Sequence, residues 1–139
     1  MIKYLTVFLL IGMVFWRCED NEDAPSIIGE WEFISNYRSG GMGSDTLYAN
    51  ENIYQNLVFS DSGTFVYEGV MISGGSNFNW YGTWTKDMTR IYFAIENVIS
   101  DEEGYKYEVQ SNILSIKWLY YGFDGAEGGI NQHNYVRNR

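Results

Sequence analysis

The stretch Leu57-Val58-Phe59-Ser60-Asp61-Ser62-Gly63-Thr64-Phe65 decides the fold of this 139-residue chain. Leu57 and Phe59 lie two positions apart, and Phe65 resumes the apolar alternation after Asp, Ser and Gly. Alternation with a period of two is typical of a half-buried strand, and Asp-Ser-Gly combines turn-forming side chains with a flexible backbone. The stretch therefore predicts two antiparallel strands joined by a tight turn.

The same alternation recurs from residue 27 onward, and no segment keeps the 3.6-residue apolar period of a helix. It predicts eight strands, at residues 28–37, 53–60, 64–72, 78–86, 90–96, 105–110, 113–120 and 131–137. In all but the last, one parity holds the bulky apolar side chains and the other is more polar. This pattern is expected of an antiparallel sheet with one buried face and one wet face.

The links between these strands alternate between short and long. Residues 61–63, 87–89 and 111–112 form short turns, whereas 38–52, 73–77, 97–104 and 121–130 form longer loops. Alternate links of an up-and-down sheet lie at opposite ends, so the short turns share one end and the long loops the other. Closing the sheet removes its edges. We therefore expect an all-β fold: an eight-stranded antiparallel up-and-down β-barrel at residues 27–139, with one loop-rimmed mouth.

A short apolar segment precedes the barrel. Lys3 supplies a positive charge, and residues 5–16 form an uncharged, mostly apolar run. This run is shorter than the roughly 20 apolar residues that a membrane-spanning helix needs. We expect residues 1–17 to be a secretory signal peptide. Cys18, the only cysteine, follows directly, and its position resembles the lipidated cysteine of bacterial lipoproteins. The alternative is a free thiol in a poorly cleaved leader.

The charge of the chain restricts its partners. Residues 18–26 form an acidic tether, and the whole chain carries 18 acidic against 9 basic side chains. A surface that binds the phosphates of nucleic acid is basic, so this acidic balance argues against nucleic acid as a partner. Anionic lipids would repel the domain as well, so that only the acyl chains on Cys18 would hold it to a membrane.

Several short motifs resemble one family in the order in which they occur. They are Gly29-Glu30-Trp31, the hairpin at residues 57–65, Tyr81-Gly82-Thr83-Trp84, Ile113-Leu114-Ser115-Ile116 and Tyr135-Val136-Arg137. Together they resemble the small lipocalin-like lipoproteins of Bacteroidetes over residues 27–137, and the acidic tether resembles the export signal of their surface-exposed members. The resemblance implies a lipocalin-like barrel with a small-molecule cavity, lipid-anchored at the outer membrane or cell surface.

The parity of the strands identifies candidate ligand-binding residues. Inward positions near the mouth are Tyr37, Phe78, Trp80, Tyr105 and Tyr120, with Tyr67 and Tyr107 deeper. Tyr and Trp combine a large apolar face with a polar tip, which suits small hydrophobic or glycan-like ligands. The alternative is that these rings fill the barrel.

These observations give two main interpretations of function. The first is a non-enzymatic, surface-tethered lipoprotein that binds a small hydrophobic or glycan-like ligand at the barrel mouth. The second is a filled barrel that acts as an accessory or inhibitory interaction module for another protein of the cell envelope. A third, an enzyme with inward carboxylates, has less support because no acidic residue stands inward on this parity.

Few other residues suggest chemistry. His133 is the only histidine, and it is expected to be an exposed strand residue. A nucleophilic triad needs a base, and the chain offers no other imidazole for that role. We expect no catalytic residue, no metal and no cofactor. Thr46, in Asp45-Thr46-Leu47, resembles an O-glycosylation acceptor of Bacteroidetes.

If Cys18 is acylated, Cys18→Ala should release the protein from membranes, because the acidic domain has no other attraction to them. Fractionation of cells that express each form, with immunoblotting of the soluble and membrane pools, measures this. Unchanged membrane retention of the variant would contradict lipidation at Cys18.

Overall fold

The computed structural model describes residues 25–40, 43–72, 74–96, 98, 102–121 and 127–139. Its nine strands are β1 (Gly29–Gly40), β2 (Gly43–Tyr48), β3 (Gln55–Phe59), β4 (Thr64–Val70), β5 (Asn77–Lys86), β6 (Arg90–Ile95), β7 (Tyr105–Gln110), β8 (Ile113–Tyr121) and β9 (Glu127–Arg137). The leader, Cys18 and most of the tether lie outside the described residues.

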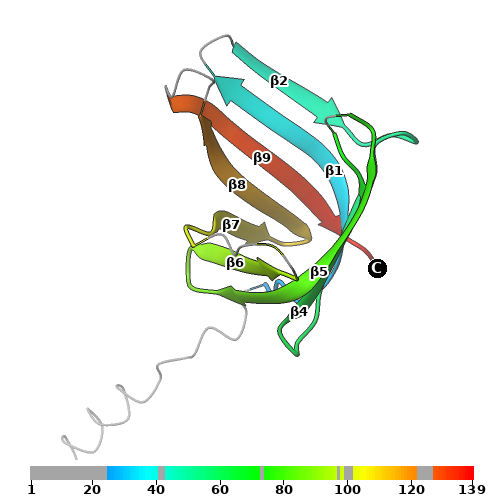
Figure 1. Ribbon diagram of the computed structural model, residues 1–139, viewed down its shortest axis with the longest axis vertical. Coiled ribbons are helices and arrows are strands. Elements are labelled where there is room, and N and C mark those ends of the chain that lie inside the picture. The colour runs from blue at the N-terminus through cyan, green and yellow to red at the C-terminus, as the bar shows by residue number, and fades with distance from the viewer. Residues whose placement is uncertain (1–24, 41–42, 73, 97, 99–101, 122–126) are drawn as a thin grey trace, which may run out of the picture.

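The strands form a closed antiparallel barrel (Figure 1). Neighbours in the sheet follow the order β2-β1-β3-β4-β5-β6-β7-β8-β9, and β1 also pairs with β9. Eight strands therefore close the barrel, and β2 is an additional strand on the edge of β1. The eight closing strands correspond to the eight predicted ones, so the predicted all-β, eight-stranded antiparallel barrel is confirmed. β9 begins earlier than predicted, at Glu127.

The three short links are tight turns at one end of the barrel, as predicted. In the turn between β5 and β6, the Asp87 carboxylate accepts hydrogen bonds from the backbone N–H groups of Thr89 and Arg90, both at 2.7 Å. The Tyr92 hydroxyl donates a third, at 2.9 Å. These hydrogen bonds stabilise the charged form and lower the pKa of Asp87 to about 2. The opposite end, where the longer links lie, is called the mouth below.

β2 is a strand where the sequence predicts a loop. The first half of β1 pairs with β3 from Gly29 to Glu32, but its second half pairs instead with β2, from Ser35 to Gly40. β1 therefore turns away from β3 as it approaches the mouth, and the edge it exposes is covered by β2. An unpaired edge leaves backbone donors and acceptors unsatisfied, which explains why the chain folds back here.

A β-bulge at Ile34 accompanies this change of partner. The register between β1 and β9 shifts between Phe33 and Ser35. A bulge adds one residue, so every side chain beyond it changes face. Asn36 is consequently inside the barrel at 2 % exposure, whereas Tyr37 is exposed on the outer face, opposite Gln132. The prediction that Tyr37 points inward is wrong because period-two counting does not detect a bulge.

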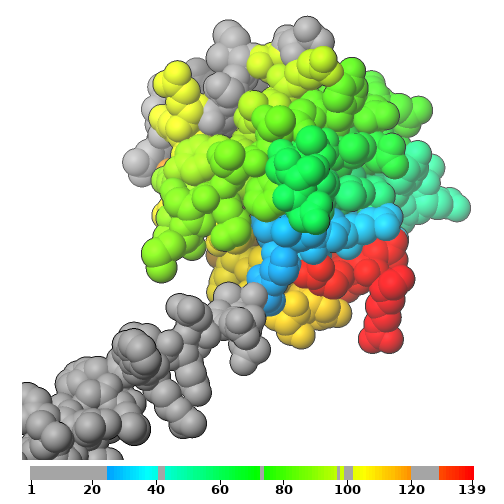
Figure 2. Space-filling view, turned by 90° about the horizontal axis from the view of Figure 1, so that it is seen from below, coloured from blue at the N-terminus to red at the C-terminus, as the bar shows by residue number. Residues whose placement is uncertain are grey.

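The apolar core fills the end of the barrel that carries the tight turns. Its fully buried side chains include Trp31, Phe33, Leu57, Phe59, Ile91 and Leu114. The Trp31 indole N–H donates to the carbonyl of Ile27 at 2.7 Å, and the Arg137 guanidinium lies over its ring, 4.2 Å from the centroid. Arg137 also donates to the carbonyl of Ile28 at 2.8 Å. Figure 2 accordingly shows the first described residues against the C-terminal strand.

Gly82 allows β5 and β6 to approach closely. A Cβ there would overlap the backbone carbonyl oxygen of Ala94 on β6. On β4, Phe65 pairs with Gly82, and its ring packs edge-to-face on Phe93 with centroids 4.8 Å apart. Gly82 therefore permits a close contact between the backbones of β5 and β6. The ring of Phe65, on the neighbouring strand, fills the space that the missing side chain leaves on the inner face.

Gly82→Ala should lower the free energy of unfolding by about 2 to 3 kcal/mol, because the added methyl group forces two backbones apart. Urea denaturation followed by far-UV circular dichroism measures the change. Thr83→Ala, at the exposed neighbouring position, is the matched control and should cost less than about 1 kcal/mol. Equal effects of the two substitutions would show that the close approach at Gly82 is unimportant.

Candidate functional site

Three aromatic rings lie together on the inner face of β4 and β5. The Tyr67 ring meets Phe78 at a centroid distance of 4.8 Å and Trp80 at 5.9 Å, and Phe78 meets Trp80 at 4.9 Å. Tyr67 packs against the core, but Phe78 and Trp80 are not part of the core cluster. The three predicted ligand-binding residues Tyr67, Phe78 and Trp80 are thus brought together at the mouth side of the barrel.

Trp80 is inward-facing by register and yet 39 % exposed. Two features of the wall explain this. β6 ends at Ile95, which pairs with Gly82, so the first half of β5 extends beyond it. β6 and β7 pair only at Arg90–Lys106 and Ile91–Tyr105. Among the described residues, the first half of β5 therefore has no partner on β6, and the inward-facing ring of Trp80 remains exposed.

The wall formed by β1 and β9 is polar. Beyond the bulge, Asn36 pairs with His133 and Arg38 pairs with Asn131. The Asn36 amide donates to the side-chain oxygen of Asn131 and, at 3.4 Å, to the carbonyl of Gln132. His133 packs against the rings of Phe33 and Trp118, with centroid distances of 5.5 and 4.7 Å. This wall therefore presents amide and imidazole groups to the interior.

A chain of hydrogen bonds crosses the interior from β9 to β3. The Tyr135 hydroxyl donates to the Tyr67 hydroxyl at 3.2 Å, and Tyr67 donates to the Gln55 side-chain oxygen at 2.5 Å. Gln55 in turn donates to the carbonyl of Val70 at 3.3 Å. The Nδ1 atom of His133 lies 3.2 Å from the Tyr135 oxygen. Because Tyr135 donates onward, His133 is assigned as the donor at Nδ1, so its Nε2 is left as an acceptor.

Burial keeps this chain uncharged. Burial, and to a smaller extent the nearby positive charge of Arg38, lowers the pKa of His133 to about 4. Burial likewise raises the pKa of Tyr67 to about 12 and that of Tyr135 well above its ordinary value. Each group is therefore neutral at pH 7, and the chain supplies fixed dipoles to the interior.

The other predicted ligand-binding residues are more dispersed. Tyr105 pairs with Ile91, close to the turn at 87–89, and the Tyr107 hydroxyl donates to the carbonyl of Asp87 at 3.1 Å. Tyr107 lies far from the mouth, as predicted. Tyr105 also lies nearer the tight-turn end than predicted. The reason is that strands in a closed barrel are staggered, so that β7 meets the part of β6 next to the turn at 87–89. Tyr120 pairs with Gly129, and its side chain is outside the described part of the structure.

Two predicted modification sites lie away from the barrel interior. Thr46 is an exposed residue of β2 and pairs with Tyr37 on the outer face. Cys18 precedes the first described residue. The structure therefore places Thr46 on an accessible strand and leaves Cys18 a prediction from the sequence.

His133 is the interior residue that the sequence analysis placed wrongly. It was expected to be exposed, but it is 9 % exposed and faces the barrel interior. The segment Asn131-Gln132-His133-Asn134-Tyr135 is too polar to show which face is buried, although His133 shares the parity of Tyr135, which is buried. Asn36 and Arg38 could not be found in this way, because their orientation depends on the bulge.

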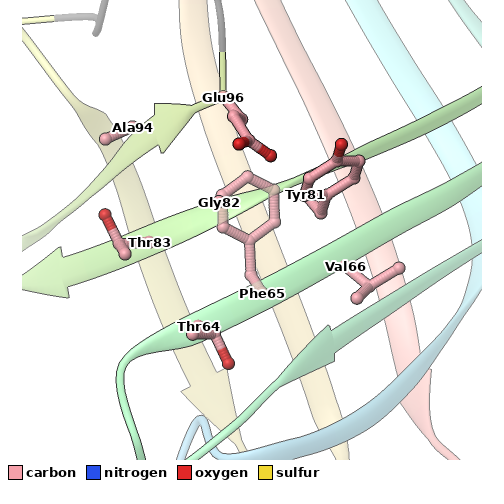
Figure 3. Close-up of a pocket in the computed structure, with 8 residues that line it drawn as sticks. All are labelled: Thr64, Phe65, Val66, Tyr81, Gly82, Thr83, Ala94 and Glu96. Atoms are coloured by element: carbon pink, nitrogen blue, oxygen red, sulfur yellow. The ribbon is translucent and has the colours of Figure 1, made fainter.

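A separate hollow of about 440 Å³ lies on the outside of the barrel, over β4, β5 and β6. Its rim is formed by outward side chains that include Val66, Tyr81, Thr83 and Glu96, with Gly82 at its floor (Figure 3). The backbone N–H of Glu96 donates to the carbonyl of Tyr81 at 3.0 Å. A hydrogen bond to the Glu96 carboxylate and its negative charge raise the pKa of the Tyr81 hydroxyl. This hollow was not anticipated from the sequence.

Comparisons with known proteins add no family. No protein-family model matches the chain, and no curated protein matches it. Within the described ranges, no three His, Cys, Asp or Glu side chains come together as a metal site would require. No helix in that part of the chain is long and apolar enough to cross a membrane.

The buried, neutral His133 should make stability depend on pH. The unfolded imidazole binds a proton near pH 6.5 and the folded one only near pH 4, so stability rises with pH between these values. Between pH 7 and pH 4.5 the protein should lose about 2 to 3 kcal/mol of unfolding free energy through this group.

The measurement is urea denaturation at both pH values, for the natural chain and for His133→Asn. The variant should lose less stability on acidification, since its side chain does not titrate. Asp87 does not confound the comparison, because both proteins contain it and its stabilising effect is lost mainly as the pH falls from its ordinary pKa of 3.8 towards about 2. Identical losses in the two proteins would argue against a neutral, desolvated His133.

Proposed function

We propose that this chain is a non-enzymatic, surface-tethered, lipocalin-like lipoprotein whose barrel binds a small ligand with an apolar or aromatic body. The observation that supports this most directly is Trp80, an inward-facing indole that remains 39 % exposed. A barrel filled by its own side chains would cover such a ring, since a buried indole is a large source of stability. Tyr67 and Phe78 extend the same surface.

The two walls of the interior favour an amphipathic ligand. Round the barrel, β5 and β9 are separated by four strand steps in either direction, so they stand on opposite walls. The rings of Phe78 and Trp80 lie on one wall, and the amide and imidazole of Asn131 and His133 lie on the other. Apolar pockets with a few placed polar groups are typical of sites for small molecules.

The same proposal places the protein at the outer membrane or cell surface, held by a lipid on Cys18. The acidic tether would separate the barrel from anionic headgroups. A ligand site at the mouth would then face the medium around the cell. This location is supported by the resemblance of the leader and tether to those of surface lipoproteins.

A second candidate function is an interaction module for another protein of the envelope, and the outer hollow favours it. Tyr81 is 53 % exposed at the rim of this hollow, and Val66 beside it is also exposed. Exposed apolar side chains around a depression suit a protein partner. The two candidates use opposite faces of β5, so adjacent residues on that strand distinguish them.

Ligand binding should therefore depend on Trp80 and not on Tyr81. The purified chain is titrated with fatty acids, bile acids, haem-like compounds and oligosaccharides while its tryptophan fluorescence is recorded. We expect saturable quenching or a blue shift with at least one class. Trp80→Ala should weaken that binding roughly tenfold or more, because the indole supplies much of the apolar contact.

Tyr81→Ala is the matched control, since it removes an aromatic ring from the outer face of the same strand. It should leave ligand binding unchanged. Silence of the natural chain across all four classes would contradict a ligand barrel. Retention of an envelope protein that is lost with Tyr81→Ala and kept with Trp80→Ala would favour the second candidate.

A further inference from the structure

We propose that Arg38 makes the barrel selective for organic anions, by pairing at the mouth with a carboxylate or similar group of a ligand whose apolar body lies on Phe78 and Trp80. This inference rests on the proposed function and specifies the chemical class of the ligand. It is carried by the position of Arg38, by the absence of a partner for its guanidinium among the described residues, and by the rings at the same end of the barrel.

The bulge at Ile34 gives Arg38 its orientation. Arg38 pairs with Asn131, and Asn131 pairs with Trp118, so the three side chains lie on one face in a row across β1, β9 and β8. That face is the interior, because the Trp118 ring packs on His133 and on Tyr105, the latter with centroids 5.8 Å apart. Without the bulge, Tyr37 would take this position and Arg38 would point outward.

The position along the barrel is also favourable. Arg38 is the third residue from the end of β1, before the link to β2, and Phe78 is the second residue of β5, after the link from β4. Both links belong to the long-loop end. A ligand that enters through the mouth therefore meets the guanidinium on one side and the two rings on the other.

Arg38 is exposed, and it makes no hydrogen bond or ion pair with any described residue. Asp45 is its cross-strand neighbour on β2 and lies on the same face, but the two do not form an ion pair. The Asp45 carboxylate is thus the one nearby charge that the described residues place beside Arg38 on this strand pair, whereas its neighbours on β9 are uncharged: Asn131 accepts a hydrogen bond from Asn36, and His133 is neutral at pH 7. The planar fork of donors of the guanidinium is therefore available for a carboxylate.

The positive charge of Arg38 on the inner face contrasts with the net negative charge of the chain, which repels anions. The formal net charge is −9, which disfavours the approach of a negative ligand at long range. A short-range ion pair with Arg38 acts against that field. Neutral ligands of the same shape cannot form this ion pair, so the guanidinium determines the selectivity for anionic over neutral ligands.

The test compares ligands that differ only in charge. Naphthalene-2-carboxylate is titrated against naphthalene-2-carboxamide, and decanoate against decanol, into the purified full-length protein by isothermal titration calorimetry. In at least one pair, the natural chain should bind the acid about tenfold more tightly than its neutral partner. Arg38→Gln should abolish this preference while the affinity for the neutral partner stays the same.

Lys117→Gln is the matched control. Lys117 pairs with Gln132, which pairs with Tyr37 on the outer face, so the substitution removes one positive charge outside the barrel. It should leave the preference for the acid intact. Loss of the preference in both variants would overturn the proposal, because it would mean that overall charge and not Arg38 sets the selectivity.

The remaining outcomes separate failure of the role of Arg38 from failure of the proposed ligand site. Equal affinity for acid and neutral partner in the natural chain, or an unchanged preference in Arg38→Gln, would overturn the role of Arg38 and leave a ligand barrel standing. Binding of none of the four compounds would instead overturn the proposed site for apolar-bodied ligands itself. If Arg38→Gln does not fold, Asp45→Asn decides the matter. Removal of the neighbouring negative charge should tighten acid binding severalfold, and no change would contradict the proposal.

Discussion

The barrel depends on β1, because this strand uses both of its edges. Along one edge it pairs with β9 from Trp31 to Gly40, which closes the sheet. Along the other it pairs first with β3 and then, towards the mouth, with β2. Closure satisfies the backbone groups of both terminal strands, and it allows Trp31 to be buried between Ile27 and Arg137. The core and the mouth are therefore both arranged around this one strand.

The bulge at Ile34 divides that strand into two parts with different roles. Below it, Trp31 and Phe33 face the core and are essentially unexposed. Above it, Asn36 and Arg38 replace the side chain of Tyr37 on the inner face. A single additional residue thus changes the lining of the barrel from apolar to polar, and it does so at the height where β1 leaves β3. The apolar core and the polar part of the lining are thus separated along the barrel axis.

The buried polar chain links these two parts. Tyr67 belongs to the aromatic group on one wall, and its hydroxyl is held by Tyr135 from the other wall and by Gln55 from β3. Buried polar groups are costly unless paired, and no buried side-chain nitrogen or oxygen in the described part of the chain lacks a partner. The network therefore holds the Tyr67 ring, and with it the rings of Phe78 and Trp80 that pack against it, in a fixed arrangement.

The eight strands that close the barrel, their tight turns and their order could be predicted from the chain, because period-two alternation and Asp-Ser-Gly turns are local properties of a segment. The same alternation placed Tyr67, Phe78 and Trp80 correctly on the inner face, since no bulge interrupts β4 or β5. By contrast, the outward orientation of Tyr37, the inward orientation of Asn36, Arg38 and His133, and the strand at residues 43–48 depend on pairing between distant segments. A bulge arises from pairing with a distant strand, and the height of Tyr105 arises from the stagger that closure imposes. Neither can be read from alternation along a single segment.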